Sequence, residues 1–199
     1  MLSFYDLLVH KVSNRFAWRC PTDLMIDHYE QHLADPHLDV GVGTGFFLDK
    51  ARFPVPEPRV TLLDPNRHCL DSAARRIARY QPSKVAADAL APLPELGRFG
   101  SIGLLYVLHC LPGTMASKAV IFDRLKPLLA DGGTLFGATI LDDDEDANAV
   151  ARALMGFYNR KGIFSNREDS QQALELELRR RFERVEISRE GCVALFAAS

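Results

Sequence analysis

Between residues 37 and 141, short apolar runs alternate with longer amphipathic segments. Apolar runs of this length are typical of buried strands, whereas the segments between them have apolar residues at helical spacing. Strands that are almost continuously apolar are buried on both faces, so the pattern predicts a parallel sheet covered by helices. The predicted strands are residues 37–41, 59–64, 84–88, 101–108 and 133–141, with helices expected within 46–53, 66–80 and 114–130.

The pattern changes after residue 141. Residues 142–180 predict two helices with a kink near Gly162, and two short apolar runs follow at 182–188 and 192–198. Only a few residues around Gly191 separate these two runs, which is too short for a crossover helix. We therefore expect the two runs to form an antiparallel pair.

The composition indicates one globular domain, because 199 residues with 47% hydrophobic side chains can bury a substantial core. A formal net charge of −2 gives no broad basic surface, so we expect no nucleic acid or membrane partner and favour small molecules. No apolar run approaches the roughly 20 residues of a transmembrane helix. The first ten residues, interrupted by Asp6, predict an amphipathic helix rather than a signal peptide. The four scattered cysteines are typical of reduced thiols, and we expect a cytoplasmic monomer or homodimer.

The sequence Gly-Val-Gly-Thr-Gly at 41–45 follows the first predicted strand and precedes a predicted helix. Glycines in such a turn let a ligand approach the main chain, and the helix N-terminus offers unpaired N–H groups. The spacing differs from the G-x-G-x-x-G of dinucleotide-binding loops, which weakens a nicotinamide interpretation. The loop therefore predicts a ligand site, with a plain tight turn as the alternative.

Two carboxylates follow the next two predicted strands. Asp64 ends the second strand, where an acid can accept hydrogen bonds from both hydroxyls of a ribose. A helix cap is the alternative role for Asp64. Asp88 ends the third predicted strand, where it could meet an adenine, and a turn residue is the alternative. Because the carboxyl ends of parallel strands lie at one edge of a sheet, we expect these carboxylates and the glycine loop to line one crevice.

Five motifs stand in order along this region: LDVGVGTG, VTLLDPN, ADAL, LYVLHCLPG and LKPLLADGGTLFGATIL. Over residues 37–141 the chain thereby resembles the class I S-adenosylmethionine-dependent methyltransferases, particularly the small bacterial and fungal type. The acid-x-Gly-x-Gly-x-Gly loop is the most specific of these motifs. The resemblance implies an α/β fold, a Rossmann-like three-layer α/β/α sandwich. Its seven-stranded, mostly parallel sheet has the order 3-2-1-4-5-7-6, with strand 7 antiparallel.

The resemblance also implies the cofactor S-adenosyl-L-methionine, which leaves as S-adenosyl-L-homocysteine. Asp39, Gly41 and Gly43 would face its methionine part, Gly45 completes the loop, Asp64 would bind the ribose, and Pro65, Asn66, Asp88 and Ala89 would lie around the adenine. We expect a single methyltransferase domain over 1–199. It would comprise an N-terminal helical lid at 1–35, a cofactor-binding core at 36–141, and late helices with a closing strand pair at 142–199.

The implied reaction is in-line transfer of a methyl group to a small-molecule acceptor, which needs alignment and exclusion of water more than a strong catalyst. His109 follows the fourth predicted strand and is a candidate catalytic base or orienting group; simple packing beside the cofactor is the alternative. We expect aromatic residues outside the common core to line the acceptor pocket, although such residues are more often ordinary core. The candidates are Tyr5, Trp18, Tyr106, Phe157, Tyr158 and Phe164, with Phe16 and Met155 near them.

Two other patterns are typical of different enzymes, but each lacks a feature that its chemistry requires. Tyr80 and Lys84 have the spacing of a dehydrogenase pair, but Pro82 between them prevents a shared helix face. Related enzymes hold magnesium after the fifth strand, where acidic residues 142–146 stand here, but the partner acid after the fourth strand is absent. We therefore expect no metal. The alternative functions are a non-catalytic S-adenosylmethionine-binding regulatory or scaffold protein and a nicotinamide-dependent oxidoreductase.

Overall fold

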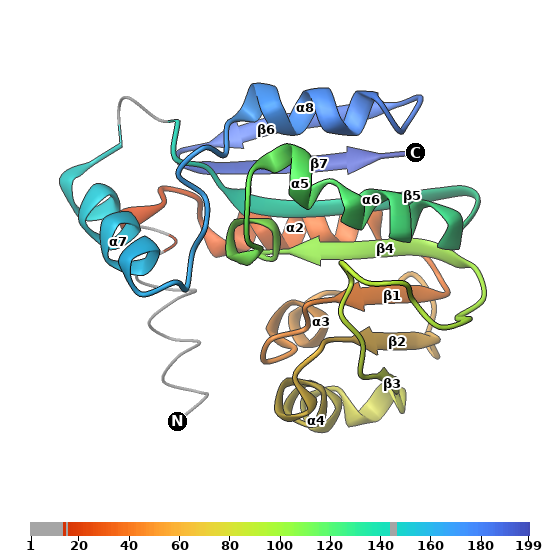
Figure 1. Cartoon of the computed structure of the whole chain (residues 1–199). Coiled ribbons are helices and arrows are strands. Elements are labelled where there is room, and N and C mark those ends of the chain that lie inside the picture. The colour runs from red at the N-terminus through yellow and green to blue at the C-terminus, as the bar shows by residue number, and fades with distance from the viewer. Residues whose placement is uncertain (1–13, 15, 144–146) are drawn as a thin grey trace.

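The structure, a computed structural model, describes residue 14, residues 16–143 and residues 147–199. Within these residues, strands form one seven-stranded sheet in the order β3-β2-β1-β4-β5-β7-β6 (Figure 1). β7 runs antiparallel to both of its neighbours, and the other neighbouring strands are parallel. The predicted fold and strand order are thus confirmed. The strands are β1 (His37–Val40), β2 (Val60–Leu63), β3 (Ser83–Val85), β4 (Phe99–Leu105), β5 (Leu129–Ile140), β6 (Val185–Glu190) and β7 (Val193–Ala198).

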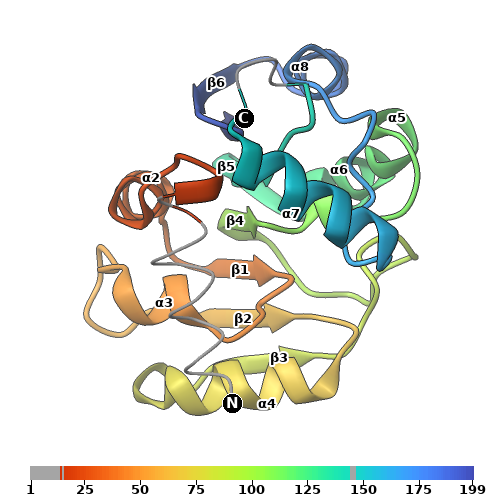
Figure 2. The same ribbon diagram turned by 90° about the vertical axis from the view of Figure 1, so that its left-hand side faces the viewer.

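Helices cover both faces of the sheet and form a three-layer sandwich (Figure 2). On one face lie α2 (Thr22–His32), α3 (Phe46–Lys50) and α4 (Arg67–Arg76), and on the other lie α5 (Met115–Lys118), α6 (Val120–Leu125) and α8 (Gln171–Arg179). The remaining long helix, α7 (Ala149–Arg160), lies beyond the carboxyl ends of the parallel strands (Figure 1). Short 3₁₀ turns are η2 (Ala78–Tyr80), η3 (Leu108–Cys110) and η4 (Lys126–Leu128).

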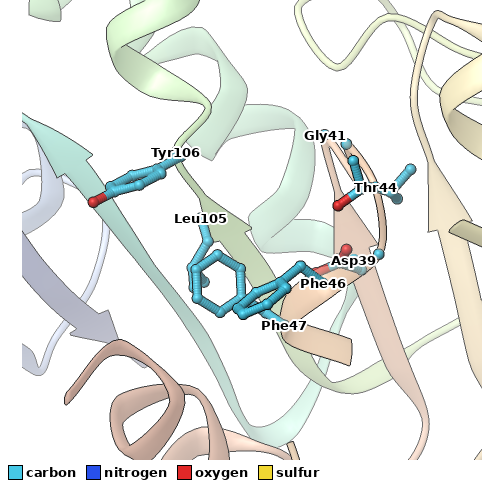
Figure 3. A pocket seen from close by; sticks show the side chains of 10 residues that line it. Asp39, Gly41, Thr44, Phe46, Phe47, Leu105 and Tyr106 are labelled. Carbon is cyan, nitrogen blue, oxygen red and sulfur yellow. The ribbon is translucent and has the colours of Figure 1, made fainter. Parts of the chain in front are cut away.

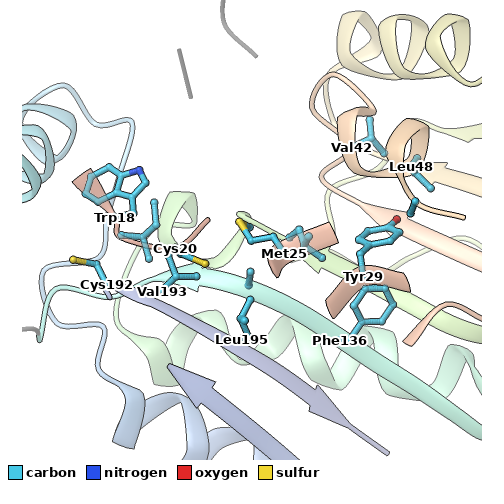
Figure 4. Packing of buried hydrophobic residues seen from close by; sticks show 14 of the residues in the cluster. Trp18, Cys20, Met25, Tyr29, Val42, Leu48, Phe136, Cys192, Val193 and Leu195 are labelled. Atoms are coloured by element: carbon cyan, nitrogen blue, oxygen red, sulfur yellow. The ribbon is translucent and has the colours of Figure 1, made fainter. Parts of the chain in front are cut away.

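Two apolar clusters fill the space between the sheet and its two helical layers. Met25 and Tyr29 of α2 lie in the first cluster with Phe136 of β5 (Figure 4). Phe122 of α6 and Leu178 of α8 lie in the second. Successive side chains of a strand point to opposite faces, so β2, β4, β5 and β7 each contribute to both clusters, whereas β1 contributes Leu38 and Val40 to the second. This double burial explains the nearly continuous apolar runs in the sequence.

Two strands end three residues earlier than the sequence pattern predicts. β3 ends at Val85 rather than at residue 88, because among the described strands it lies at the edge of the sheet, paired with β2 alone, and the chain then leaves the sheet. β4 ends at Leu105 rather than at residue 108. There Tyr106 adopts a φ of 58°, and the chain turns into η3. Both errors matter, because these ends carry candidate site residues.

The C-terminal predictions agree better with the structure. The segment after residue 141 contains two helices, α7 and α8, although residues 161–170 separate them where a kink was predicted. β6 and β7 pair antiparallel, as predicted. The expected helix of the first ten residues lies outside the described residues, so α2 is the long helix that the structure describes within the predicted lid at 1–35.

Candidate functional site

The glycine loop, residues 41–45, connects the end of β1 to α3. All three glycines have positive φ angles, 70° at Gly41, 51° at Gly43 and 71° at Gly45. The N–H of Gly41 donates to the carbonyl of Leu63 at 2.8 Å, which ties the loop to the end of β2. Side chains other than hydrogen are strained in this region of φ, so glycine is favoured at each position.

Packing explains two of the three glycines. A Cβ at Gly41 would collide with Val107, and one at Gly45 would lie 2.9 Å from the backbone Cα of Ala73 in α4. At Gly43, by contrast, no atom among the described residues lies within 4 Å of the position a Cβ would take. The main chain at Gly43 therefore borders open space, as a loop that lets a ligand approach its backbone would.

The loop forms one wall of a pocket at the carboxyl edge of the sheet (Figure 3). The opposite wall comes from Leu105 and Tyr106, which follow one another at the end of β4. Two aromatic side chains from the start of α3 complete the pocket. Its lining residues are Asp39, Gly41, Val42, Gly43, Thr44, Gly45, Phe46, Phe47, Leu105 and Tyr106.

Asp64 lies directly after β2 and is 7% exposed. One of its carboxylate oxygens accepts the N–H of Asn66 at 2.8 Å. Burial raises the pKa of Asp64, and hydrogen bonds from the backbone of Asn66, Gly43 and Val42 oppose that rise. The cap of α4 is Asn66, whose side chain accepts the N–H of His68 at 2.9 Å. Asp64 is thus placed against the glycine loop and does not cap the helix.

The residues predicted around the adenine lie outside the lined pocket. Pro65 and Asn66 are exposed at the start of α4. Asp88 is exposed in a turn three residues beyond β3, where its carboxylate accepts the N–H of Leu90 at 2.9 Å. The prediction that Asp88 ends the third strand is therefore wrong, because β3 already ends at Val85. Ala89 is buried in the second apolar cluster. Their roles toward an adenine stay predictions.

His109 lies in η3 rather than directly after β4, and it is 2% exposed. Its Nδ1 accepts the backbone N–H of Ile140 at 3.3 Å, and its ring contacts Phe164 with 4.5 Å between the ring centroids. Burial, together with the nearby Lys118 ammonium, lowers the pKa of His109 to about 3. A neutral imidazole with its acceptor nitrogen already bonded is poorly suited to remove a proton from a substrate. The geometry favours the packing interpretation of His109.

Four of the predicted aromatic residues, Trp18, Phe157, Tyr158 and Phe164, do not line this pocket. Trp18 packs on Phe164, and Phe164 packs on Tyr158 at a centroid distance of 4.8 Å. Phe157 is 44% exposed on α7. Tyr5 lies outside the described residues. Tyr106 is the one aromatic candidate of this set, among described residues, that also lines the pocket.

Tyr106 joins the pocket to the N-terminal region. Its hydroxyl donates to Oδ1 of Asn14 at 2.9 Å, and its backbone N–H donates to the carbonyl of Ala138 at 2.7 Å. Burial raises the pKa of Tyr106 well above its usual range. The side chain therefore stays a neutral phenol at physiological pH.

Phe46, Phe47 and Leu105 line the pocket and were missed by the sequence reasoning. The two phenylalanines open α3, and the sequence pattern predicts no more for them than a place in an amphipathic helix. An available signal was their position, because residues of the first turn after a glycine loop lie next to whatever that loop binds. No such local signal marks Leu105, whose place depends on where β4 ends.

The structure gives no independent support for a metal site or a membrane span. Among the described residues, no group of three or more histidine, cysteine or acidic side chains is placed to hold a metal ion. Asp143, at the start of the acidic run, is instead paired with Arg189 at 2.7 Å. No helix in the described part of the chain is long and apolar enough to cross a membrane.

Comparison with known proteins identifies the family. Residues 38–135 match the model of a methyltransferase domain. The chain is 37% identical over 198 residues to demethylluteothin O-methyltransferase from Streptomyces thioluteus, an alignment that covers 99% of this chain and 86% of that protein. The chain belongs to the methyltransferase family. A second relative, methyltransferase aurB from Calcarisporium arbuscula, is 37% identical, with 100% of this methyltransferase and 92% of the relative covered.

Solved structures show the same fold. The O-methyltransferase NcsB1 from neocarzinostatin biosynthesis, in complex with S-adenosyl-L-homocysteine and 1,4-dihydroxy-2-naphthoic acid, superposes with a TM-score of 0.67 at 18% identity. The superposition covers 99% of this methyltransferase and 57% of that chain. The recognised family and the fold that it implied are therefore confirmed.

Proposed function

We propose that this methyltransferase transfers the methyl group of S-adenosyl-L-methionine to a hydroxyl oxygen of a small, conjugated acceptor. The observation that carries the proposal is the pocket in which the glycine loop and Asp39 face the aromatic side chains of Phe46, Phe47 and Tyr106. The name of the relative from Streptomyces thioluteus supports oxygen as the accepting atom. When bound, the cofactor supplies an electrophilic methyl group whose leaving group is a neutral thioether.

The residues present fit this cofactor. The open space beside Gly43 allows the methionine part to approach the main chain. Asp39, only 8% exposed, presents a carboxylate on the same side of the pocket, which is suited to an ammonium group. Asp64 stands at the end of the neighbouring strand with further capacity to accept hydrogen bonds from ribose hydroxyls. We place Gly41 and Gly45 at the methionine part with Asp39, and Pro65, Asn66, Asp88 and Ala89 around the adenine.

The pocket favours alignment over base catalysis. Of the residues that line it in the described chain, Asp39 and Tyr106 are the ones with ionisable side chains. Asp39 is assigned to the cofactor, and Tyr106 keeps its proton because burial raises its pKa. We therefore propose an acceptor hydroxyl that is acidic by itself, as on a conjugated ring, so that the protein needs only to orient it and exclude water.

The aromatic cluster of Trp18, Tyr158 and Phe164 supports an acceptor side next to Tyr106, because the His109 ring contacts both Phe164 and Tyr106. We place the acceptor between this cluster and the glycine loop, with Phe157 at its exposed margin. None of the four cysteines forms a disulfide in the described part of the chain, which supports a cytoplasmic location for a chain that acts as one domain.

The test has two stages. Calorimetric titration with S-adenosyl-L-homocysteine and with NAD separates a methyltransferase from an oxidoreductase. A methyltransferase should bind S-adenosyl-L-homocysteine and not NAD. The protein is then incubated with methyl-labelled cofactor and one of two matched sets of acceptor compounds. One set contains phenols and enols, the other contains aliphatic amines, and label transfer to the two sets is compared. Label transfer to amines alone would overturn the assignment of oxygen. Binding without transfer to any acceptor would favour the non-catalytic scaffold protein.

A further inference from the structure

A chain of buried polar groups leads from the base of the pocket into the core. The hydroxyl of Tyr29 lies 2.8 Å from Oδ1 of Asp39 and 2.8 Å from Nε2 of His37. Nδ1 of His37 lies 2.8 Å from Oγ of Ser101 in β4. Tyr29, His37 and Ser101 are each 0% exposed. Such a continuous polar network is costly to bury unless its members are paired, and here each pairs with the next.

The direction of these hydrogen bonds follows from their chemistry. A carboxylate can only accept, so the Tyr29 hydroxyl must donate to Asp39. Having used its single proton, the Tyr29 oxygen must accept from Nε2 of His37. Burial and the Asp39 charge raise the pKa of Tyr29 well above its usual range, so the hydroxyl keeps the proton that it donates. Asp39 is thus held from the core side by a neutral donor.

Aromatic packing fixes the position of the donor. The Tyr29 ring stacks on Phe47, with centroids 6.1 Å apart and planes at 13°, and it meets Phe136 edge-on at 5.1 Å. The His37 ring lies 6.0 Å from the same Phe136. Since the rings cannot rotate freely in a close-packed core, the hydroxyl has little choice of direction. Removal of the hydroxyl alone would leave this packing intact.

We propose that Tyr29 and His37 are positioning residues that hold the Asp39 carboxylate toward the ammonium group of the methionine part of S-adenosyl-L-methionine. The inference rests on the proposed function, because that function supplies the ammonium group. A hydroxyl donor orients the carboxylate and leaves its negative charge in place, whereas a cationic partner would neutralise it. His37 acts through Tyr29, since its Nε2 is 3.8 Å from Oδ1 of Asp39 and hence too distant for a hydrogen bond.

The test compares two ligands on one variant. S-adenosyl-L-homocysteine carries the ammonium group, whereas 5′-methylthioadenosine has the same adenosine and thioether sulfur but a methyl group in place of the amino-acid chain. Tyr29→Phe should weaken binding of S-adenosyl-L-homocysteine by about tenfold and leave 5′-methylthioadenosine within about twofold, because one hydrogen bond to a charged group is lost. Tyr80→Phe, in a ring that packs on Phe53 outside the network, is the matched control and should change neither affinity.

His37 provides a second, independent variant. His37→Phe should reproduce the selective loss, His37→Gln should recover part of it because its amide can donate to Tyr29, and Tyr29→Phe/His37→Phe should be little worse than either single variant. Unliganded melting temperatures identify variants that have not folded. Equal weakening of both ligands, or unchanged binding of S-adenosyl-L-homocysteine in the folded variants, would overturn the positioning role. Failure of the wild-type protein to bind either ligand would instead overturn the proposed function.

Discussion

The proposed cofactor side and the proposed acceptor side of the pocket are assembled in different ways. On the cofactor side, the glycine loop follows β1 directly, and Asp64 bonds the N–H of Asn66 only two residues away. On the acceptor side, Tyr106 bonds Asn14, 92 residues earlier in the chain. Asn148, at the start of α7, likewise donates to the carbonyl of Phe16. One side is built mainly from local geometry, and the other from segments that only the completed fold brings together.

This difference predicts that substitutions on the two sides of the pocket will have different effects. Residues of the cofactor side are constrained by φ angles and by contacts with neighbouring elements, so substitution there should affect folding or cofactor affinity directly. The aromatic residues proposed for the acceptor side lie outside the glycine loop, so substitution there should affect cofactor affinity less. Acceptor preference should therefore be alterable without loss of the cofactor.

The largest effect at neutral pH is expected at Gly45. Gly45→Ala places a Cβ 2.9 Å from the backbone of Ala73 at a φ of 71°. Strain together with this collision should lower the free energy of unfolding by roughly 2–4 kcal/mol, measured by denaturant titration. Gly43→Ala, which has a similar φ but open space around the new methyl group, is the control. It should cost roughly 1–2 kcal/mol. Equal losses in the two variants would contradict the role assigned to packing on α4.

Substitution of Asp64 should lower ligand affinity more than it lowers the stability of the fold. Asp64→Ala removes acceptors for the ribose hydroxyls, and each hydrogen bond to a charged group contributes about 1.5–3 kcal/mol. Affinity for S-adenosyl-L-homocysteine should fall about tenfold or more, measured by calorimetry, in a protein that still unfolds cooperatively. Asp71→Ala, which removes a half-exposed carboxylate of α4 paired with Lys84, is the control and should leave this affinity unchanged. Unchanged affinity in folded Asp64→Ala would remove the ribose assignment.

His109 should affect the free energy of unfolding at acid pH. Its pKa is about 3 in the folded protein and about 6.5 when unfolded, so the unfolded state binds the proton first as the pH falls. Its contribution to stability is fully present above pH 6.5 and declines between about pH 6.5 and 3, by up to about 1.4 kcal/mol per pH unit. His109→Gln should reduce this slope in denaturant titrations, and wild-type turnover should show no step from His109 near pH 6.5. A step near pH 6.5 that vanishes in the variant would restore the role of base.

The smallest effect is expected on the acceptor side. Tyr106→Phe removes the hydrogen bond to Asn14 but keeps the ring that lines the pocket. The apparent KM for the acceptor should rise by about three- to tenfold, as loss of one neutral hydrogen bond of about 1 kcal/mol implies. Affinity for S-adenosyl-L-homocysteine should stay the same. A larger loss of cofactor than of acceptor binding would place Tyr106 on the cofactor side of the comparison.

Sequence patterns predicted most of the fold because their signals are local. Continuous apolar runs located the five parallel strands, and the short distance between the last two runs required antiparallel pairing. Strand ends were less accurate. β3 leaves the sheet early because an edge strand has one partner, and β4 ends early because Tyr106 takes a φ of 58°, which no apolar pattern records.

The sequence by itself determined the glycine loop and the order of the elements around it, because spacing along the chain fixes which residues a turn presents at a strand end. It also marked Asp64 through its place after β2. Only the tertiary structure decided that Phe47 faces the pocket, that His109 is buried beneath Phe164, and that Tyr29 reaches Asp39. The physical reason is that burial and hydrogen-bond partners depend on neighbours from other elements, such as α2 for Asp39 and the connection after α7 for His109, which only the completed fold brings into contact.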